Sequence, residues 1–85
     1  MTDYGEITKM ALRGRNVVVI VKSFYVTKKR FVEYIEYLSK TSIPFEARYY
    51  DERVIFPNGS LVTFATKGEA HQRKTTGRIF DEVEL

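Results

Sequence analysis

The stretch that decides the fold is Val17-Val18-Val19-Ile20-Val21, five consecutive β-branched apolar residues. A strand that is buried on both faces has this composition, and such strands occur mainly in parallel sheets that are covered by helices. Polar residues follow at once in Lys22-Ser23 and mark the end of the run. The run therefore predicts the central strand of an α/β sheet.

A short amphipathic helix is predicted before this strand, over residues 3–13. Asp3 suits the N-cap position, and Glu6 follows it at the spacing of a capping box. Apolar residues then recur three and four positions apart, and Gly14 ends the helix.

A second helix is predicted after the strand, over residues 27–40, with Thr27 as its N-cap. Its apolar positions fall on one face, whereas three consecutive bases occupy the solvent side of its first turn. Pro44 prevents any helix from continuing past this point.

The apolar pattern beyond Pro44 has the period of strands. Residues 45–49 alternate, and two apolar runs, 53–56 and 61–64, flank Asn58-Gly59. Asn-Gly between apolar runs is a strong hairpin signal, because both residues accept the positive φ of a type I′ turn. A β-hairpin with its turn at Asn58-Gly59 is therefore predicted.

The C-terminal part has a less decisive pattern. Residues 67–77 are polar and contain two glycines, which predicts a loop, and residues 78–83 fit either a last strand or a helical turn. The fold class is α/β: residues 1–85 form a single small domain, with a buried central strand, the hairpin and two helices.

Composition excludes several classes of protein. The chain has 85 residues, no cysteine and one histidine, so it has neither a disulfide framework nor a thiolate zinc site. Its longest apolar run is far shorter than the roughly 20 residues of a membrane span. We expect a cytoplasmic protein without a membrane contact, located in the host cytoplasm if a phage encodes it.

Positive charge is concentrated in two parts of the chain. Seven bases and no acid lie between Ile7 and Val32, and residues 67–78 are basic again, although the formal net charge is only +3. Such segments either contact nucleic-acid phosphates or form the solvated faces of helices. The candidate nucleic-acid-binding residues are Arg13, Arg15, Lys28, Lys29, Arg30, Arg73 and Lys74.

Aromatic residues make up 14% of the chain, a generous supply for so small a core. They either fill that core or form a surface for a protein partner or for self-association. The candidate partner-binding residues are Phe24, Tyr25, Tyr49 and Tyr50.

Three local patterns suggest chemistry. Residues 68–75 match a phosphate-binding loop except that Arg73 replaces its second glycine, and a polar basic loop is the alternative. Asp81 and Glu82 follow two apolar residues and are candidate metal ligands, or simply an acidic chain end. His71 has no acid or nucleophile near it in sequence and is expected to be an exposed residue. No cofactor is expected.

Taken in order, these segments resemble part of a known family of ATPases. Residues 15–23 and the helix after them resemble the second strand and helix of helicase-like P-loop ATPases. The hairpin around Pro57-Asn58-Gly59-Ser60 is similar to one in phage terminase large subunits, in which a polar segment then leads to a Walker B Asp-Glu. The resemblance covers residues 7–85 and implies magnesium binding and water activation at Asp81-Glu82.

The chain departs from that family in one respect that bears on catalysis. It contains neither the phosphate-binding Walker A loop nor its lysine, which phosphoryl transfer requires. We therefore expect a non-enzymatic binding module of phage or mobile-element origin, whose partner is a packaging or helicase-type ATPase or a host factor. The alternatives are a nucleic-acid-binding domain and a remnant nucleotide-dependent enzyme that uses Asp81 and Glu82.

Overall fold

The run of β-branched residues forms β1 (Asn16–Val21), which pairs in parallel with a strand on each side. Its neighbours are β4 (Leu61–Thr66) and β5 (Phe80–Glu84). Val17, Val18 and Val19 are fully buried, so the predicted central strand and the α/β class are confirmed. The structure is a computed structural model that describes residues 3–73 and 78–85.

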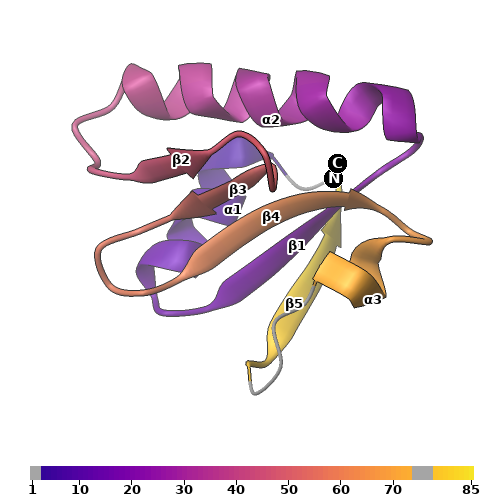
Figure 1. The fold of residues 1–85 in the computed structure, drawn as a ribbon. Helices are drawn as coiled ribbons and strands as arrows, with labels where there is room; N and C mark the ends of the chain where they lie inside the picture. The colour runs from indigo at the N-terminus through magenta and orange to yellow at the C-terminus, as the bar shows by residue number, and fades with distance from the viewer. Residues whose placement is uncertain (1–2, 74–77) are drawn as a thin grey trace.

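The sheet has five strands in the order β2-β3-β4-β1-β5. Its other half is antiparallel: β2 (Glu46–Arg48) pairs with β3 (Arg53–Ile55), and β3 pairs with β4. β2 and β5 are therefore the two edge strands (Figure 1).

Two long helices cover one face of this sheet and a short one lies on the other (Figure 1). The long helices are α1 (Tyr4–Leu12) and α2 (Phe24–Ser39), and the main core lies between them and the sheet. On the opposite face α3 (Ala70–Arg73), a single turn, packs through Ala70 against Val18 and Ile20.

The ends of α1 agree with the prediction. The Asp3 carboxylate accepts a hydrogen bond of 2.9 Å from the backbone N–H of Glu6. Gly14 has φ of +90°, and the N–H groups of Gly14 and Arg15 donate back to the carbonyls of Ala11 and Met10. These paired bonds form a Schellman motif, which glycine permits at little cost.

The start of α2 corrects the prediction. The helix begins at Phe24 with Ser23 as N-cap, so Thr27 lies within the first turns rather than before them. Thr27 is buried, and its hydroxyl donates to the Ser23 carbonyl. The amphipathic pattern misses the first turn because Phe24 and Tyr25 are apolar residues that point to solvent.

The hairpin is where the sequence predicts it, but its turn type differs. Within the described residues Glu52 is the only non-glycine residue with positive φ, so Asn58 cannot belong to a type I′ turn, although Gly59 has φ of +90°. The N–H of Gly59 donates to the Phe56 carbonyl over 2.9 Å. Pro57 fixes a negative φ, which favours a type I turn followed by a left-handed glycine.

The C-terminal part contains two elements where the pattern was ambiguous or misleading. The polar composition of residues 67–77 predicts a loop, yet α3 forms within them because Ala70 is buried against the sheet. The alternative for residues 78–83 is decided in favour of a strand, β5. Residues 74–77 lie outside the described part of the chain. Among the described residues no helix is long and apolar enough to cross a membrane.

Candidate interaction surface

The four aromatic side chains that the sequence proposes for partner contact are all exposed. Phe24 and Tyr25 lie at the start of α2, and Tyr49 and Tyr50 lie between β2 and β3. The exposed fractions of these four side chains, in this order, are 67%, 90%, 51% and 96%. We call these four residues the aromatic surface.

Lys28 connects the two halves of the aromatic surface. Its Nζ donates a hydrogen bond of 2.9 Å to the Tyr49 carbonyl and lies 5.8 Å from the centroid of the Tyr49 ring. Lys28 is one helical turn after Phe24, so both face the same side of α2. The buried ring of Phe31 meets Tyr49 edge-on at 5.3 Å. These contacts hold the β2–β3 connection against α2.

Arg30 takes part in a different contact, which joins α2 to α1. Its guanidinium donates to Glu33 over 2.9 Å, and the Tyr4 hydroxyl donates to the same carboxylate oxygen over 2.9 Å. The hydrogen bonds from Arg30 and Tyr4 lower the pKa of Glu33. Burial, and then the bond to Glu33, raises the pKa of Tyr4 to about 12. Arg30 therefore has a structural partner.

The other predicted nucleic-acid-binding residues do not form one surface. Arg13 and Arg15 lie where α1 leads into β1, whereas Lys28 and Lys29 lie on α2, which begins beyond the opposite end of β1. A strand of this length spans about 16 Å. Arg73 ends α3 on the other face of the sheet, and Lys74 lies outside the described residues. Among the members of this set that the structure describes, only Lys28 and Lys29 lie beside the aromatic surface.

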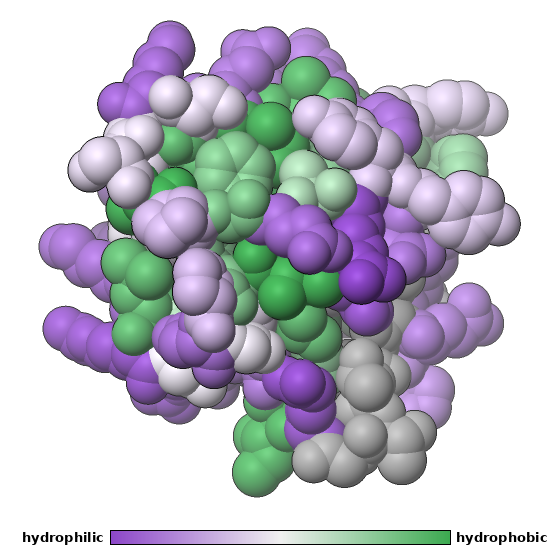
Figure 2. Space-filling model, turned by 60° about the vertical axis from the view of Figure 1, so that its left-hand side comes forward, coloured by the Kyte–Doolittle hydropathy of each residue, from purple (hydrophilic) through white to green (hydrophobic). Residues whose placement is uncertain are grey.

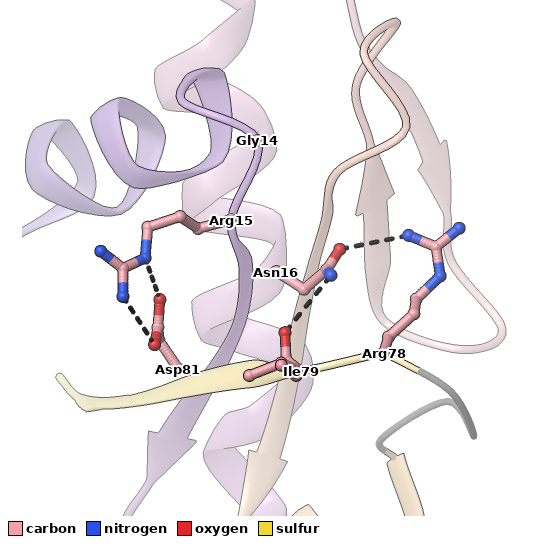
Figure 3. A pocket seen from close by; sticks show the side chains of 6 residues that line it. All are labelled: Gly14, Arg15, Asn16, Arg78, Ile79 and Asp81. Carbon is pink, nitrogen blue, oxygen red and sulfur yellow. Dashed lines mark hydrogen bonds and ion pairs between the residues drawn. The ribbon is translucent and has the colours of Figure 1, made fainter.

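A pocket of about 420 Å³ lies where β1 and β5 begin (Figure 3). Asn16 lines this pocket and makes three hydrogen bonds there. Its Oδ1 accepts from the Leu61 N–H over 3.1 Å and from the Arg78 guanidinium over 3.3 Å. Its side-chain NH2 donates to the Ile79 carbonyl. Arg15 and Arg78 also line the pocket, but their guanidinium groups point away from one another (Figure 3). The pocket is therefore a junction between segments rather than a clamp for one anion.

The acidic pair does not have the Walker B arrangement. Asp81 and Glu82 are the second and third residues of β5, instead of following an apolar strand. Successive side chains of a strand point to opposite faces, so the two carboxylates diverge. Asp81 is also engaged by Arg15 through two hydrogen bonds of 2.5 and 3.2 Å. Among the described residues no group of three or more His, Asp or Glu side chains could hold a metal ion.

The phosphate-loop pattern also lacks its usual structure. A phosphate loop opens a long helix, whose N–H groups and dipole contribute to binding. Here Gly68 and Glu69 precede the single turn of α3, and the Glu69 carboxylate accepts from the Thr66 hydroxyl over 3.0 Å. His71 is exposed on α3, as the sequence predicts.

The structure also shows an apolar hollow that the sequence did not predict. Figure 2 shows hydrophobic side chains gathered on the side that lies at the left in Figure 1, with hydrophilic side chains around them. The α2–β2 and β3–β4 connections meet on this side, and a shallow hollow is lined there by Pro44, Phe45, Ile55 and Pro57. In the sequence, the hollow is indicated only by two prolines next to aromatic residues: Pro44 precedes Phe45, and Pro57 follows Phe56.

Comparison with known protein families, with curated proteins and with solved structures finds no match.

Proposed function

We propose that this chain is a non-enzymatic binding module that contacts a protein partner through the aromatic surface. The observation that carries the proposal is the high exposure of Tyr25 and Tyr50, at 90% and 96%. Tyrosine is enriched among the residues that dominate binding energy, because a large ring buries much area and its hydroxyl tolerates water.

The packing of Tyr49 supports the same proposal. Lys28 and Phe31 both contact Tyr49, so this part of the aromatic surface is held in place before a partner arrives. Pre-organisation of this kind lowers the entropic cost of association. The partner class that the terminase resemblance suggests, a packaging or helicase-type ATPase or a host factor, is part of the proposal.

Site-specific photo-crosslinking in the native host tests the proposal. A benzophenone amino acid placed at Tyr25 or at Tyr50 should cross-link to the same partner protein. The matched control is the same amino acid at Ile79, which is 89% exposed but lies by the starts of β1 and β5. Equal cross-linking from all three positions, or none from Tyr25 and Tyr50, contradicts the proposal.

Lys28 and Lys29 favour a second candidate function, the binding of single-stranded nucleic acid. Exposed rings can stack on bases while adjacent lysines contact phosphates. Fluorescence anisotropy with a labelled single-stranded oligonucleotide tests it, and affinity should fall steeply as salt rises. The double variant Lys28→Gln/Lys29→Gln should weaken binding, whereas Arg13→Gln should not. Binding that is insensitive to salt contradicts this candidate.

A further inference from the structure

The strand β2 forms the edge of the sheet that lies opposite β5 (Figure 1). It pairs with β3 on one side, and no other strand within residues 3–73 and 78–85 pairs with it. An edge strand presents backbone N–H and C=O groups on which a strand of another chain can pair. The ladder on the other side of β3 shows which groups of β2 these are.

The hydrogen bonds of β3 determine which backbone groups of β2 face outward. The N–H of Phe56 donates to the Ser60 carbonyl over 3.0 Å, so the backbone groups of Phe56 face β4. Directions alternate along a strand, so those of Ile55 face β2. Ile55 lies opposite Glu46 in the register of β2 with β3, and the backbone groups of Glu46 therefore face β3. The N–H and C=O of Ala47, the next residue, face the open edge.

The two side chains that flank Ala47 carry opposite charges. Glu46 and Arg48 lie on the same face of the sheet, and both are exposed. Within the chain, Arg48 Nε lies 3.0 Å from Glu46 Oε2, and the exposed fractions of the two side chains are 56% for Arg48 and 62% for Glu46. An ion pair this exposed contributes little to stability, so both groups can pair with a second chain at little cost.

We propose that β2 pairs antiparallel with β2 of a second copy of this chain, about a two-fold axis at Ala47. In this register the two Ala47 residues exchange both backbone hydrogen bonds, and Glu46 of each copy lies opposite Arg48 of the other. Opposite charges in directly opposed positions stabilise a pair of strands, whereas like charges destabilise it. The edge is therefore complementary to itself, and the two five-stranded sheets become continuous across the axis.

Two charge reversals separate pairing between copies from the ion pair within one chain. Glu46→Lys and Arg48→Glu each oppose like charges across the axis, and each should raise the dissociation constant of the dimer by about tenfold. An equimolar mixture of the two variants should associate as tightly as the wild type, because the two bases of one variant then face the two acids of the other. Sedimentation equilibrium of the full chain measures all four samples.

The mixture is the decisive sample. In each variant the ion pair between positions 46 and 48 of one chain is broken, and mixing does not restore it. If Glu46 and Arg48 affect association only by supporting the fold of their own chain, the mixture should associate as weakly as either variant alone. Recovery in the mixture therefore requires contact between the two copies.

A second pair of variants tests the backbone bonds of Ala47. Ala47→Pro removes an N–H that β3 does not use, so it should abolish self-association while the chain stays folded. Ala47→Ser keeps the N–H and nearly the size of the side chain, and should associate like the wild type. In the wild type, the hydrogen exchange of the Ala47 N–H, followed by NMR, should slow as the protein concentration rises. The charge-reversal mixture decides the proposal even if Ala47→Pro does not fold.

Three results would overturn the proposal. They are a wild type that stays monomeric at about 1 mM, single reversals that associate like the wild type, and a mixture that does not recover. The first would leave β2 as an edge whose charges only prevent pairing, or one that pairs with a different protein. The pairing does not depend on the proposed function: Tyr25→Ser/Tyr50→Ser should leave self-association unchanged, so the two proposals can fail separately.

Discussion

Asn16 joins three segments at the end of the sheet where β1 begins. Its side chain accepts from the buried Leu61 N–H and from Arg78, and donates to the Ile79 carbonyl (Figure 3). Asn16→Ala should lower the free energy of unfolding by about 2 kcal/mol, because the Leu61 N–H loses its acceptor. Asn16→Asp keeps that acceptor and should cost less. Urea denaturation measures both, and equal losses would contradict this role of Oδ1.

Tyr34 makes the free energy of unfolding depend on pH in the alkaline range. Its ring is fully buried, its hydroxyl lies 2.8 Å from Thr8 Oγ1, and burial raises its pKa above the ordinary value of 10.0. A raised pKa means that the folded state keeps a proton that the unfolded chain releases, so stability is complete below pH 10 and falls above it.

Tyr34→Phe tests this dependence. At neutral pH it should cost about 1 kcal/mol, for one buried hydrogen bond. Between pH 7 and pH 11 the wild type should lose about 1.4 kcal/mol more than the variant. Urea titrations at both pH values measure the difference, and parallel losses in the two proteins would show that Tyr34 is not responsible.

At the scale of elements, the two long helices begin in different ways. The Asp3 side chain caps α1, whereas the side chain of Ser23 makes no capping hydrogen bond to α2. Asp3→Ala should therefore lower the free energy of unfolding by about 1 kcal/mol, and Ser23→Ala by less than about 0.5 kcal/mol. Thermal and urea unfolding of the two variants measure the contrast, and a larger loss for Ser23→Ala would contradict it.

The elements that the sequence predicts well are those with a strong local cause. The run at β1, the cap and glycine of α1, and the turn residues near Gly59 each determine structure over a few positions. The start of α2 was missed because Phe24 and Tyr25 break its amphipathic pattern by facing solvent. Local propensity cannot show that α3 forms, because one turn is stable only when Ala70 packs on the sheet.

The aromatic surface was only half predictable, for a related reason. Sequence composition suggested exposed aromatics, but their grouping depends on the contact of Lys28 with Tyr49, 21 positions away. Likewise, the ion pair of Arg15 with Asp81 joins residues that lie 66 positions apart. Pairings over such separations follow from strand order, which no local pattern specifies.

At the scale of the whole molecule, the strand order predicts uneven stability. β1 lies between two strands and under two helices. Within residues 3–73 and 78–85, β5 pairs only with β1, and it follows the single turn of α3. Segments that make few buried contacts can break their backbone hydrogen bonds without global unfolding of the protein. We therefore expect α3 and β5 to open together as a unit, while the rest of the sheet stays folded.

Native-state hydrogen exchange tests this expectation. The β5 amides that face β1, those of Asp81 and Val83, should exchange with an opening free energy on the order of 2 kcal/mol below that of the β1 amides. Ile35→Val, a change in α2, should lower the opening free energy of the β1 amides by about 1 kcal/mol. It should leave the opening free energy of the β5 amides unchanged, because α2 stays packed when β5 opens. If β5 and β1 instead share one opening free energy and shift together, the sheet unfolds as a single unit.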